Sequence, residues 1–380
     1  AALFKEHGLV LPGFLIAAEL ALFEGPVSPR LRRLAPGIAF LTALGVLVLL
    51  ARSAVFAGRL SGTYTAEALE GLGAGGRALT MLRVVPEWLR LLVWPAHLQA
   101  DYSPQELVAS AGFGPREGFG LLLVIAAIAA AWLSRRRAPA VTFGFLWIAV
   151  ALFPVSNLLL PTGILLAERT LFLASIGLVI AGGGAAAALL GPGRSLRLRR
   201  RLMAAACGAL VLAGVVRSAA RHRVWHDEAE QTVLSAEDAP KSWRTQQALG
   251  YHLFESGRKP EAVLTYRRAI ALAPRRHAWR VRNDLARRYF AEGDNQGAID
   301  ELRASLTEAP DREESWNYLI LAELALGDYG AAARDADTVM ARGGSPELFG
   351  GLRALADSAA RDHAPPGSIR IRIRTGPPPQ

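Results

Sequence analysis

The feature that most constrains this chain is a change of character near Val224. Hydrophobic runs long enough to cross a membrane recur up to about residue 219, and after them the sequence turns polar and a repeat of paired helices begins. A spanning helix needs roughly 20 mostly apolar residues. Because few protein classes join a bundle of spans to an array of helical repeats, this order predicts an all-α protein with two unlike parts.

Six segments reach or approach spanning length, and together with the loops between them they make up a predicted transmembrane bundle over residues 1–223. The segments lie at about 8–24, 36–57, 119–134, 139–160, 168–190 and 202–219. Arginine clusters follow the first, third and fifth of them, at Arg30–Arg33, Arg135–Arg137 and Arg194–Arg201. By the positive-inside rule these clusters mark cytoplasmic loops. The other loops, and everything after about residue 220, then lie on the outer side.

A further apolar stretch, at about 78–98, tests this topology. Its charged residues fall on one helical face; they are Arg83, Glu87 and Arg90. Trp88 and Trp94 suit the headgroup zone of a bilayer. A seventh span here would put the first two arginine clusters on opposite sides of the membrane. The pattern therefore favours an interfacial or re-entrant helix, with a spanning helix as the alternative.

The net charge of +10 is unevenly distributed. Residues 1–240 carry 22 Lys/Arg against 15 Asp/Glu, residues 241–358 carry 17 of each, and residues 359–380 carry 4 against 1. The basic excess mostly borders apolar segments, where orientation signals and anionic lipid account for it. Nucleic acid is therefore not an expected partner. The single Cys207 gives no disulfide framework.

From residue 241 the sequence repeats with a period near 34, the length of a tetratricopeptide unit. Gly257, Gly293 and Gly327 occupy the expected turns, and Pro274 and Pro310 follow the second helices of the first two units. Small residues such as Gly250 stand where paired helices must approach closely. The pattern is typical of a tetratricopeptide α-solenoid, whose concave groove binds extended peptides.

The limits of this array follow from the same pattern. We expect repeats with a final capping helix over 241–359, because a terminal repeat must cover its neighbour's apolar face. Residues 224–240 then form a connector. Residues 360–380 are rich in Pro, Gly and Arg and lack a packing pattern, so we predict that they are disordered.

Polar clusters gather on the predicted outer side of the membrane. They are Lys5-Glu6-His7, Asp101-Tyr102-Ser103, and Asn157 with Glu168-Arg169. A carboxylate at the end of a span is often only a boundary residue, but ionisable groups at membrane depth usually pair or function. A lipid-phosphate sugar donor would need Arg or Lys for its phosphate, and Lys5 and Arg169 are placed for that. Transfer to a hydroxyl needs a carboxylate base; the candidates are Glu6, Asp101 and Glu168.

Other chemistries lack a signal in this sequence. There is no carboxylate-rich metal site, Walker loop, nucleophile elbow or zinc-ligand spacing, so no metal ligand is predicted, although a divalent metal is left open. The glycine run Gly182–Gly184 lies in an apolar segment and indicates close helix packing rather than a phosphate cradle.

Three blocks of this sequence resemble blocks of a known protein family. "KEHGLVLP" (5–12), "RALTMLRVVPEWLRLLVWPAHLQADYS" (77–103) and "FPVSNLLLPTGILLAERTLFLAS" (153–175) resemble blocks of the transmembrane and tetratricopeptide-repeat-containing O-mannosyltransferase family and its bacterial relatives. The resemblance implies the C-terminal part of a C-type glycosyltransferase fold, a polyprenyl-phosphate-linked sugar as donor, and protein hydroxyls as acceptor. The positions it carries over are Lys5, Glu6, Arg77, Asp101, Tyr102, Ser103, Ser156, Asn157, Glu168 and Arg169.

The chain departs from that family in ways that shape the expectation. Enzymes of this fold carry key acids in the first external loop, which would lie upstream of Ala1. We therefore expect this chain to be an N-terminally truncated part of the enzyme that lacks its main catalytic base. The Ala/Arg/Gly-rich composition indicates a bacterial inner-membrane protein with periplasmic repeats, and a sugar that need not be mannose. The alternative is a non-catalytic membrane scaffold whose repeats gather protein partners. Transport is less favoured, because the charges cluster at span ends.

Overall fold

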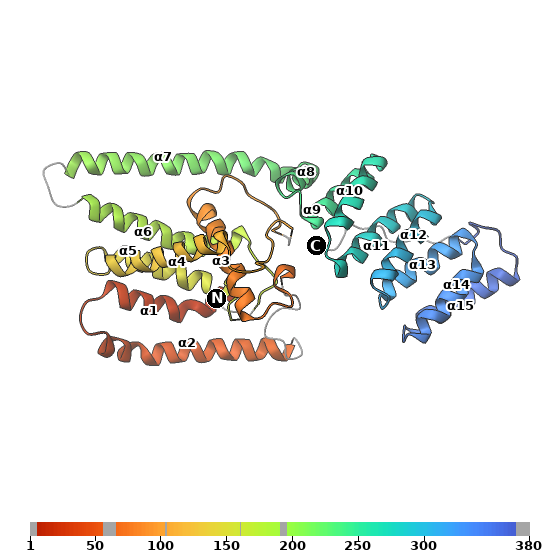
Figure 1. Cartoon of the computed structure of the whole chain (residues 1–380), viewed down its shortest axis with the longest axis horizontal. Helices are drawn as coiled ribbons and strands as arrows, with labels where there is room; N and C mark the ends of the chain where they lie inside the picture. Colours follow the sequence, from red (N-terminus) through yellow and green to blue (C-terminus); the bar gives the residue numbers. More distant parts are fainter. Residues whose placement is uncertain (1–5, 56–65, 103–104, 160, 191–195, 370–380) are drawn as a thin grey trace. The chain divides into compact units, whose positions relative to one another are not determined.

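The computed structural model describes residues 6–55, 66–102, 105–159, 161–190 and 196–369. Within these ranges the fold is all-helical, without a strand, which confirms the predicted all-α class (Figure 1). The chain divides into two compact units, Ala1–Val224 and Trp225–Gln380. The division lies where the sequence changes from apolar runs to repeats.

The first unit is a set of helices joined by loops with short 3₁₀ turns. They are η1 (Glu6–Val10), α1 (Leu11–Leu22), α2 (Val27–Val55), η2 (Glu67–Leu69), α3 (Ala74–Val93), α4 (Pro115–Ser134), α5 (Pro139–Leu152), η3 (Phe153–Val155), η4 (Glu168–Leu171), α6 (Phe172–Leu190) and α7 (Leu196–His222). α5 is the centre of the packing, because α1, α4 and α6 all lie against it. α2 packs on α1 and α7 on α6, so these two long helices form opposite edges of the unit (Figure 1).

Four helices in the described ranges are long and apolar enough to cross a membrane. They are Val27–Val55, Pro115–Ser134, Glu168–Leu189 and Arg200–His226. The predicted spans at 8–24 and 139–160 correspond to the shorter apolar helices Gly8–Leu22 and Pro139–Val155. Both fall below roughly 20 residues, since Pro12 and Pro139 lie at helix starts and the chain turns at Phe23 and Ser156. By length and composition, these helices are consistent with a membrane protein.

Glycine brings the central helices together. A side chain at Gly144 on α5 would overlap the backbone of α6 at Gly177, and one at Gly177 would lie 2.6 Å from the carbonyl oxygen of Gly144. Small residues at such crossings let helix backbones approach within van der Waals contact. In the glycine run of α6, Gly184 meets Ala140, whereas Gly182 and Gly183 have nothing within 4 Å. The predicted packing role therefore belongs to one glycine of the three.

α3 is amphipathic. It overlaps most of the stretch predicted at 78–98, but it begins and ends a few residues earlier. Thr80, Met81, Val84, Trp88 and Leu91 form its buried face. Trp88, predicted at the headgroup level, is instead only 8% exposed in the core, because it shares the i, i+4 stripe of the apolar residues. Trp94, one residue past the helix, is half-exposed.

The second unit is a succession of helices, each packed on the next. They are α8 (Glu228–Asp238), α9 (Trp243–Glu255), α10 (Lys259–Leu272), α11 (Arg275–Ala291), α12 (Asn295–Glu308), α13 (Glu313–Leu326), α14 (Tyr329–Ala341) and α15 (Pro346–Arg361). α11 also touches α13, and α13 touches α15. The apolar core is correspondingly split into separate clusters between neighbouring helix pairs. α8 occupies most of the predicted connector and packs on α9.

The turns of this unit follow from glycine and short polar side chains. Gly257, Gly293 and Gly327 adopt φ of 79°, 82° and 88°, a left-handed conformation that glycine adopts without strain. The side chains of Asp294 and Asp328 then cap the next helix by accepting backbone N–H bonds. Each turn thus reverses the chain and starts the second helix of a pair.

The prediction of a disordered tail over 360–380 is wrong for its first part. α15 extends to Arg361, and Gly367 N donates to Ala325 O across 3.2 Å. Tyr329 Oη donates to Ala364 O at 3.1 Å, and Ile369 packs on the apolar cluster of α13–α15. Backbone hydrogen bonds hold this segment even though its composition lacks a packing pattern. Residues 370–380 lie outside the described ranges.

Candidate functional site

Loops far apart in the sequence meet around one apolar cluster of the first unit. Its buried members come from η2, α3, the loop after α3 and the loop before α6; they are Ala66, Leu69, Met81, Val84, Trp88, Leu91, Tyr102, Leu165, Leu166 and Leu171. Ala66 N also donates to Thr162 O across 2.8 Å. The second and third sequence blocks, 77–103 and 153–175, therefore form one structure.

Glu168 joins these two blocks by hydrogen bonds. Its Oε1 accepts the backbone N–H of Gln99 at 2.7 Å and the hydroxyl of Tyr102 at 3.0 Å. Both bonds go to Oε1. Burial, with the charge of Glu168, raises the pKa of the Tyr102 phenol well above its ordinary value, so Tyr102 remains a donor. The carboxylate is held in one orientation, with Oε2 as its second oxygen.

A cation lies beside this junction. Arg90 Nε donates to Glu87 Oε2 at 2.8 Å, and its NH1 donates to His97 O at 3.0 Å. Its charge acts on Tyr102 and opposes the rise of the phenol pKa. The pKa of Arg90 is itself raised, because hydrogen bonding and attraction from Glu87 outweigh the opposing effect of burial. A hollow of about 470 Å³ adjoins this region; it is lined by Pro86, Leu89, Arg90, Val93, Trp94, Ala96 and His97.

α7 is fixed to the same loop. Its Arg217 donates to the carbonyl oxygens of Pro95 and Ala96, and the guanidinium lies 6.0 Å from the centre of the Trp94 ring. The loop after α3 is therefore held from one side by Glu168 and from another by Arg217.

The first block also reaches this region. Val10, the last residue of η1, packs in one cluster with Leu92 of α3 and Leu173 of α6. Glu6 begins η1, but its side chain lies outside what the structure describes, as do Lys5 and Ser103. The site geometry described here therefore does not include these three predicted groups.

The other predicted residues differ in their surroundings. Arg169 is exposed next to Glu168, and Asp101 is half-buried next to Tyr102. Arg77 is half-buried and donates to Leu158 O at 3.4 Å, on the loop before α6. Among the predicted residues, Tyr102 and Glu168 bond directly to each other.

Asn157 supports a loop. It is fully buried with φ of 55°, and its Oδ1 accepts the N–H and the hydroxyl of Thr162 at 2.7 and 2.9 Å. Its Nδ2 donates to Val155 O and Ile164 O, both at 3.2 Å. Ser156 likewise donates to Phe153 O. These side chains shape the turn that presents Glu168 and Arg169.

Sequence reasoning missed Arg90, His97, Gln99 and Arg217 as parts of this site. Arg90 was placed on a polar face but given no partner. Gln99 contributes a backbone N–H, which no side-chain pattern reveals. Arg217 lies in a predicted span of otherwise apolar residues, and a lone arginine there is the signal that could have found it.

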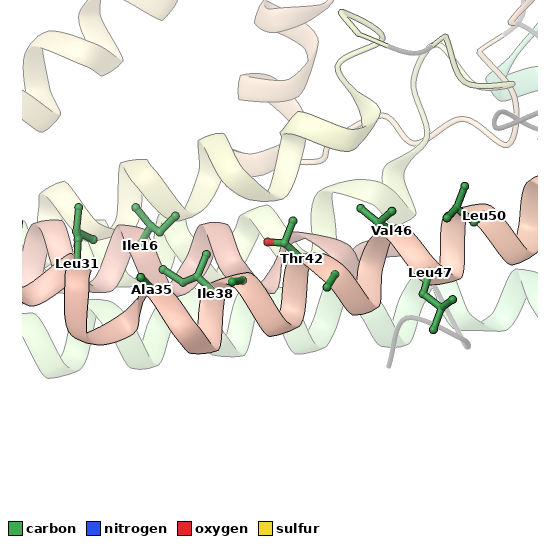
Figure 2. Close-up of a pocket in the computed structure, with 10 residues that line it drawn as sticks. Ile16, Leu31, Ala35, Ile38, Thr42, Val46, Leu47 and Leu50 are labelled. Atoms are coloured by element: carbon green, nitrogen blue, oxygen red, sulfur yellow. The ribbon is translucent and has the colours of Figure 1, made fainter.

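An apolar groove lies elsewhere in the unit, between α1 and α2. It measures about 800 Å³ and is lined by Ile16 of α1 and by a row of side chains along α2 (Figure 2). The lining side chains carry no charge, so the groove offers a surface for hydrocarbon and no catalytic group. Within the described ranges, no three His, Cys, Asp or Glu side chains gather as a metal site.

Comparison with known protein families, with curated proteins and with solved structures finds no match to this chain.

Proposed function

We propose that this protein is a membrane glycosyltransferase that transfers a sugar from a polyprenyl-phosphate donor to protein hydroxyls. The observation that carries the proposal is the Glu168 junction. A carboxylate bonded to a phenol is followed in the chain by an exposed arginine, at the point where Glu168–Leu189, a helix long enough to span a membrane, begins. This is the depth at which a lipid-linked phosphate and its sugar would lie.

The chemistry assigns a role to each group. Arg169 binds the donor phosphate, since a guanidinium can contact two phosphate oxygens at once. The bond between the sugar C1 and the phosphate oxygen breaks as the acceptor hydroxyl oxygen bonds to C1. Glu168 Oε2 takes the hydroxyl proton, while Tyr102 and Gln99 hold the carboxylate in place through Oε1. Polyprenyl phosphate is the leaving group.

The second unit recruits the acceptor in this proposal. The helix pairs α9–α10, α11–α12 and α13–α14, with left-handed turn glycines 36 and 34 residues apart, support a tetratricopeptide solenoid with α15 as its cap. Such arrays bind extended polypeptide. The arginine clusters between the apolar segments support a periplasmic location for this unit in a bacterial inner membrane.

The test measures donor binding and transfer in membranes that contain the protein. Binding of a fluorescent short-chain polyprenyl phosphate is compared with transfer of radiolabelled sugar to periplasmic protein. Arg169→Ala is expected to abolish both, and Arg169→Lys to restore little, because an ammonium lacks the bidentate fork. Glu168→Gln should abolish transfer and leave phosphate binding intact.

Arg32→Ala, an exposed arginine of α2, is the matched control and should behave as wild type. Full transfer by Arg169→Ala would contradict the donor role. Correctly inserted wild-type protein that neither binds the donor nor transfers sugar would contradict the enzyme and favour a membrane-anchored scaffold.

A further inference from the structure

Arg217 lies near the end of the apolar run of α7. The predicted span is 202–219, so this arginine lies close to the end that the topology places on the outer side. No residue in the apolar window of this helix is buried, and the exposed side chains before the arginine include Val211, Leu212, Val215 and Val216. An arginine at the end of such a run extends its guanidinium to the level of the lipid headgroups. In a bilayer, its charge would therefore lie at the depth of the phosphate groups.

The groups that accept hydrogen bonds from Arg217 are uncharged. Its Nη2 atom donates to Pro95 O and Ala96 O in the loop after α3, and its guanidinium lies 6.0 Å from the centre of the Trp94 ring. Within the described ranges, no carboxylate forms a salt bridge with this arginine. These contacts orient the guanidinium, but carbonyl oxygens do not neutralise its charge.

An apolar hollow lies beside this guanidinium. Trp94 and Ala96, which contact Arg217, are also part of the lining of the hollow of about 470 Å³. Leu89 and Val93 belong to the same lining and are 43% and 60% exposed, on the side of α3 that faces away from the core. The volume is within the range of about 300–1,000 Å³ that is usual for ligand pockets. The hollow thus combines a hydrocarbon surface with a neighbouring cation.

The polar groups of the lining add little net charge. Arg90 forms a salt bridge with Glu87 at 2.8 Å, and it also donates to His97 O at 3.0 Å. The described residues that line the hollow include no carboxylate, and Glu168 of the neighbouring junction is not among them. Arg217 therefore supplies the uncompensated positive charge here, and the lining offers no base for a reaction.

We propose that the hollow and Arg217, together called the lipid site, bind a membrane phospholipid with an anionic headgroup. The N–H groups of Arg217 would contact the phosphodiester, and an acyl chain would lie over Leu89 and Val93. One cation matches the single negative charge of a phosphodiester. A choline headgroup would bring an ammonium that the arginine repels. A sugar donor would need a base, which the lining lacks, whereas a resident lipid needs none.

A lipid at this site would join two elements that have few other bonds to each other. α7 packs on α6 and reaches the loop after α3 through Arg217 (Figure 1). The same loop is bonded to Glu168 through Gln99. A phospholipid between α3 and α7 would therefore hold this loop in place. The inference does not depend on the proposed function, because lipid binding requires neither sugar donor nor transfer.

The test measures lipid binding to the whole protein by native mass spectrometry. The protein is stripped of lipid in detergent and titrated with phosphatidylglycerol or phosphatidylcholine at about 150 mM ammonium acetate, where long-range attraction is screened. We expect one phosphatidylglycerol molecule to bind in preference to phosphatidylcholine. Glycerol 3-phosphate, the headgroup phosphate without chains, should not compete at equal concentration, because the hollow contributes through its apolar surface.

Arg217→Gln should weaken phosphatidylglycerol binding about tenfold, because it removes a charged hydrogen bond while its amide can still donate to the loop carbonyls. Arg217→Lys should fall between this variant and wild type. The matched control is Arg116→Gln, which removes an exposed arginine at the start of α4 and should change binding less than twofold.

Val93→Asp tests the hollow and keeps the bonds of Arg217 to the loop. A carboxylate facing the acyl chain and the phosphate should weaken binding about tenfold as well. Val108→Asp is its control, because Val108 is a 55% exposed valine of the loop before α4. Unchanged circular dichroism of the variants excludes misfolding as the cause.

Four results would overturn the proposal. Wild-type affinity in both Arg217→Gln and Val93→Asp would show that the lipid binds elsewhere, and equal weakening by the controls would show that the attraction is unspecific. Equal affinity for phosphatidylcholine, or full competition by glycerol 3-phosphate, would remove the anionic lipid as the ligand. Displacement of phosphatidylglycerol by a lower concentration of a sugar-linked polyprenyl phosphate would assign the hollow to the donor instead.

Discussion

The hydroxyl of Tyr102 donates to Oε1 of Glu168 across 3.0 Å, joining residues 66 positions apart. The bond links the loop after α3 to the 3₁₀ turn before α6, and the backbone N–H of Gln99 adds a second bond to the same oxygen. Two hydrogen bonds on one carboxylate oxygen fix the rotamer of Glu168. The loop and the start of an apolar helix therefore move as one piece.

Tyr102→Phe should loosen this junction without emptying the apolar cluster. The phenyl ring still fills its place, but Glu168 loses a donor, so the local opening free energy of residues 95–102 should fall by about 1–2 kcal/mol. Hydrogen exchange of that peptide measures the loss. In a Glu168→Ala background the same substitution should cost much less. Equal costs in both backgrounds would mean that the bond contributes nothing.

Much of the fold could be predicted from local pattern. The predicted segments 119–134 and 202–219 lie inside α4 and α7, because apolar runs of that length specify helices by composition alone. Left-handed glycines are also visible in the sequence, since Gly257, Gly293 and Gly327 recur with the repeat period. These features depend on residues close together in the chain.

The site geometry depends on contacts that no local pattern contains. Tyr102 and Glu168 were grouped by side of the membrane, but their bond follows from the packing of α3 against η4. Trp88 was misplaced because an aromatic residue near charges fits both a headgroup zone and a buried stripe. The segment 364–369 was misjudged because its hydrogen bonds go to α13 and α14, far along the chain.

Glu323 makes the stability of the repeat array depend on pH. Its side chain on α13 is buried, and burial, then the charge of Asp335, raises its pKa to about 8, against an ordinary value near 4.5; Arg303 opposes this from 3.1 Å. The folded state thus holds a proton that the unfolded state releases. The stability that this protonated side chain contributes is fully present below about pH 4.5 and is lost as the pH rises through 8.

Glu323→Gln should remove that loss. The neutral amide mimics the protonated acid, so the urea midpoint of the second unit, followed by Trp316 fluorescence, should fall less between pH 5 and 9 than in wild type. The slopes of the unfolding free energy against pH then differ between the two proteins by at most about 1.4 kcal/mol per pH unit. Asp311→Asn, an exposed carboxyl in a turn, is the control and should leave the wild-type slope unchanged. Identical slopes for Glu323→Gln and wild type would refute the assignment.

Gly250 sets the distance between α9 and α10. A Cβ at this position would lie 2.9 Å from Cδ2 of Tyr266, whose ring is fully buried and whose hydroxyl donates to Asp284 at 2.7 Å. The ring cannot move without breaking that bond, so Gly250→Leu should destabilise the first pair by about 1–3 kcal/mol or more. It should also weaken acceptor binding more than donor binding.

Hydrogen exchange across α9–α11 measures the effect, with Gly351→Ala as the matched control. Gly351 lies inside α15 with nothing within 4 Å, so alanine there should stabilise its helix slightly. Undiminished protection in Gly250→Leu would show that the pair tolerates a wider spacing. Equal losses of donor and acceptor binding would mean that the array is coupled to the membrane unit.

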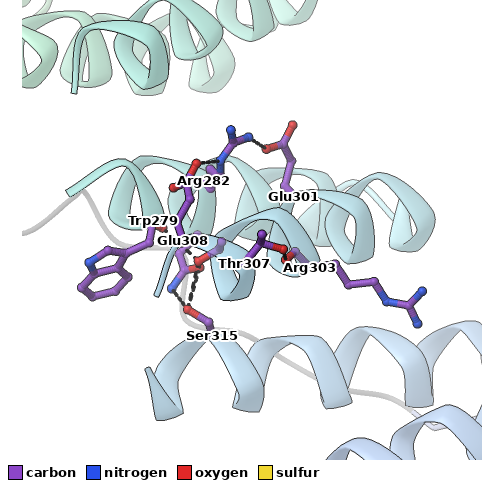
Figure 3. Close-up of polar contacts among 9 residues, drawn as sticks. Trp279, Arg282, Glu301, Arg303, Thr307, Glu308 and Ser315 are labelled. Atoms are coloured by element: carbon purple, nitrogen blue, oxygen red, sulfur yellow. Dashed lines mark hydrogen bonds and ion pairs between the residues drawn. The ribbon is translucent and has the colours of Figure 1, made fainter. Parts of the chain in front are cut away.

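Arg282 clamps α11 to α12 through two carboxylates. Its Nε donates to Glu308 at 3.0 Å and its NH1 donates to Glu301 at 2.9 Å, and Figure 3 shows the guanidinium between them. The three side chains are 17–22% exposed, so water screens the pairs only partly. Arg282→Met keeps most of the stem but leaves two carboxylates seven residues apart on α12 without their shared cation.

We expect this change to destabilise the α11–α12 pair by about 1–3 kcal/mol, with Arg282→Lys recovering only part, since one ammonium cannot reproduce both directed bonds. The control is Arg258→Met, which removes an exposed ion pair with Glu261 and should leave stability almost unchanged. Urea unfolding of the second unit compares them. A loss no larger than that of the control would mean that solvent already satisfies both carboxylates, and the helix pair would then owe its stability to Leu302 and the apolar cluster around it.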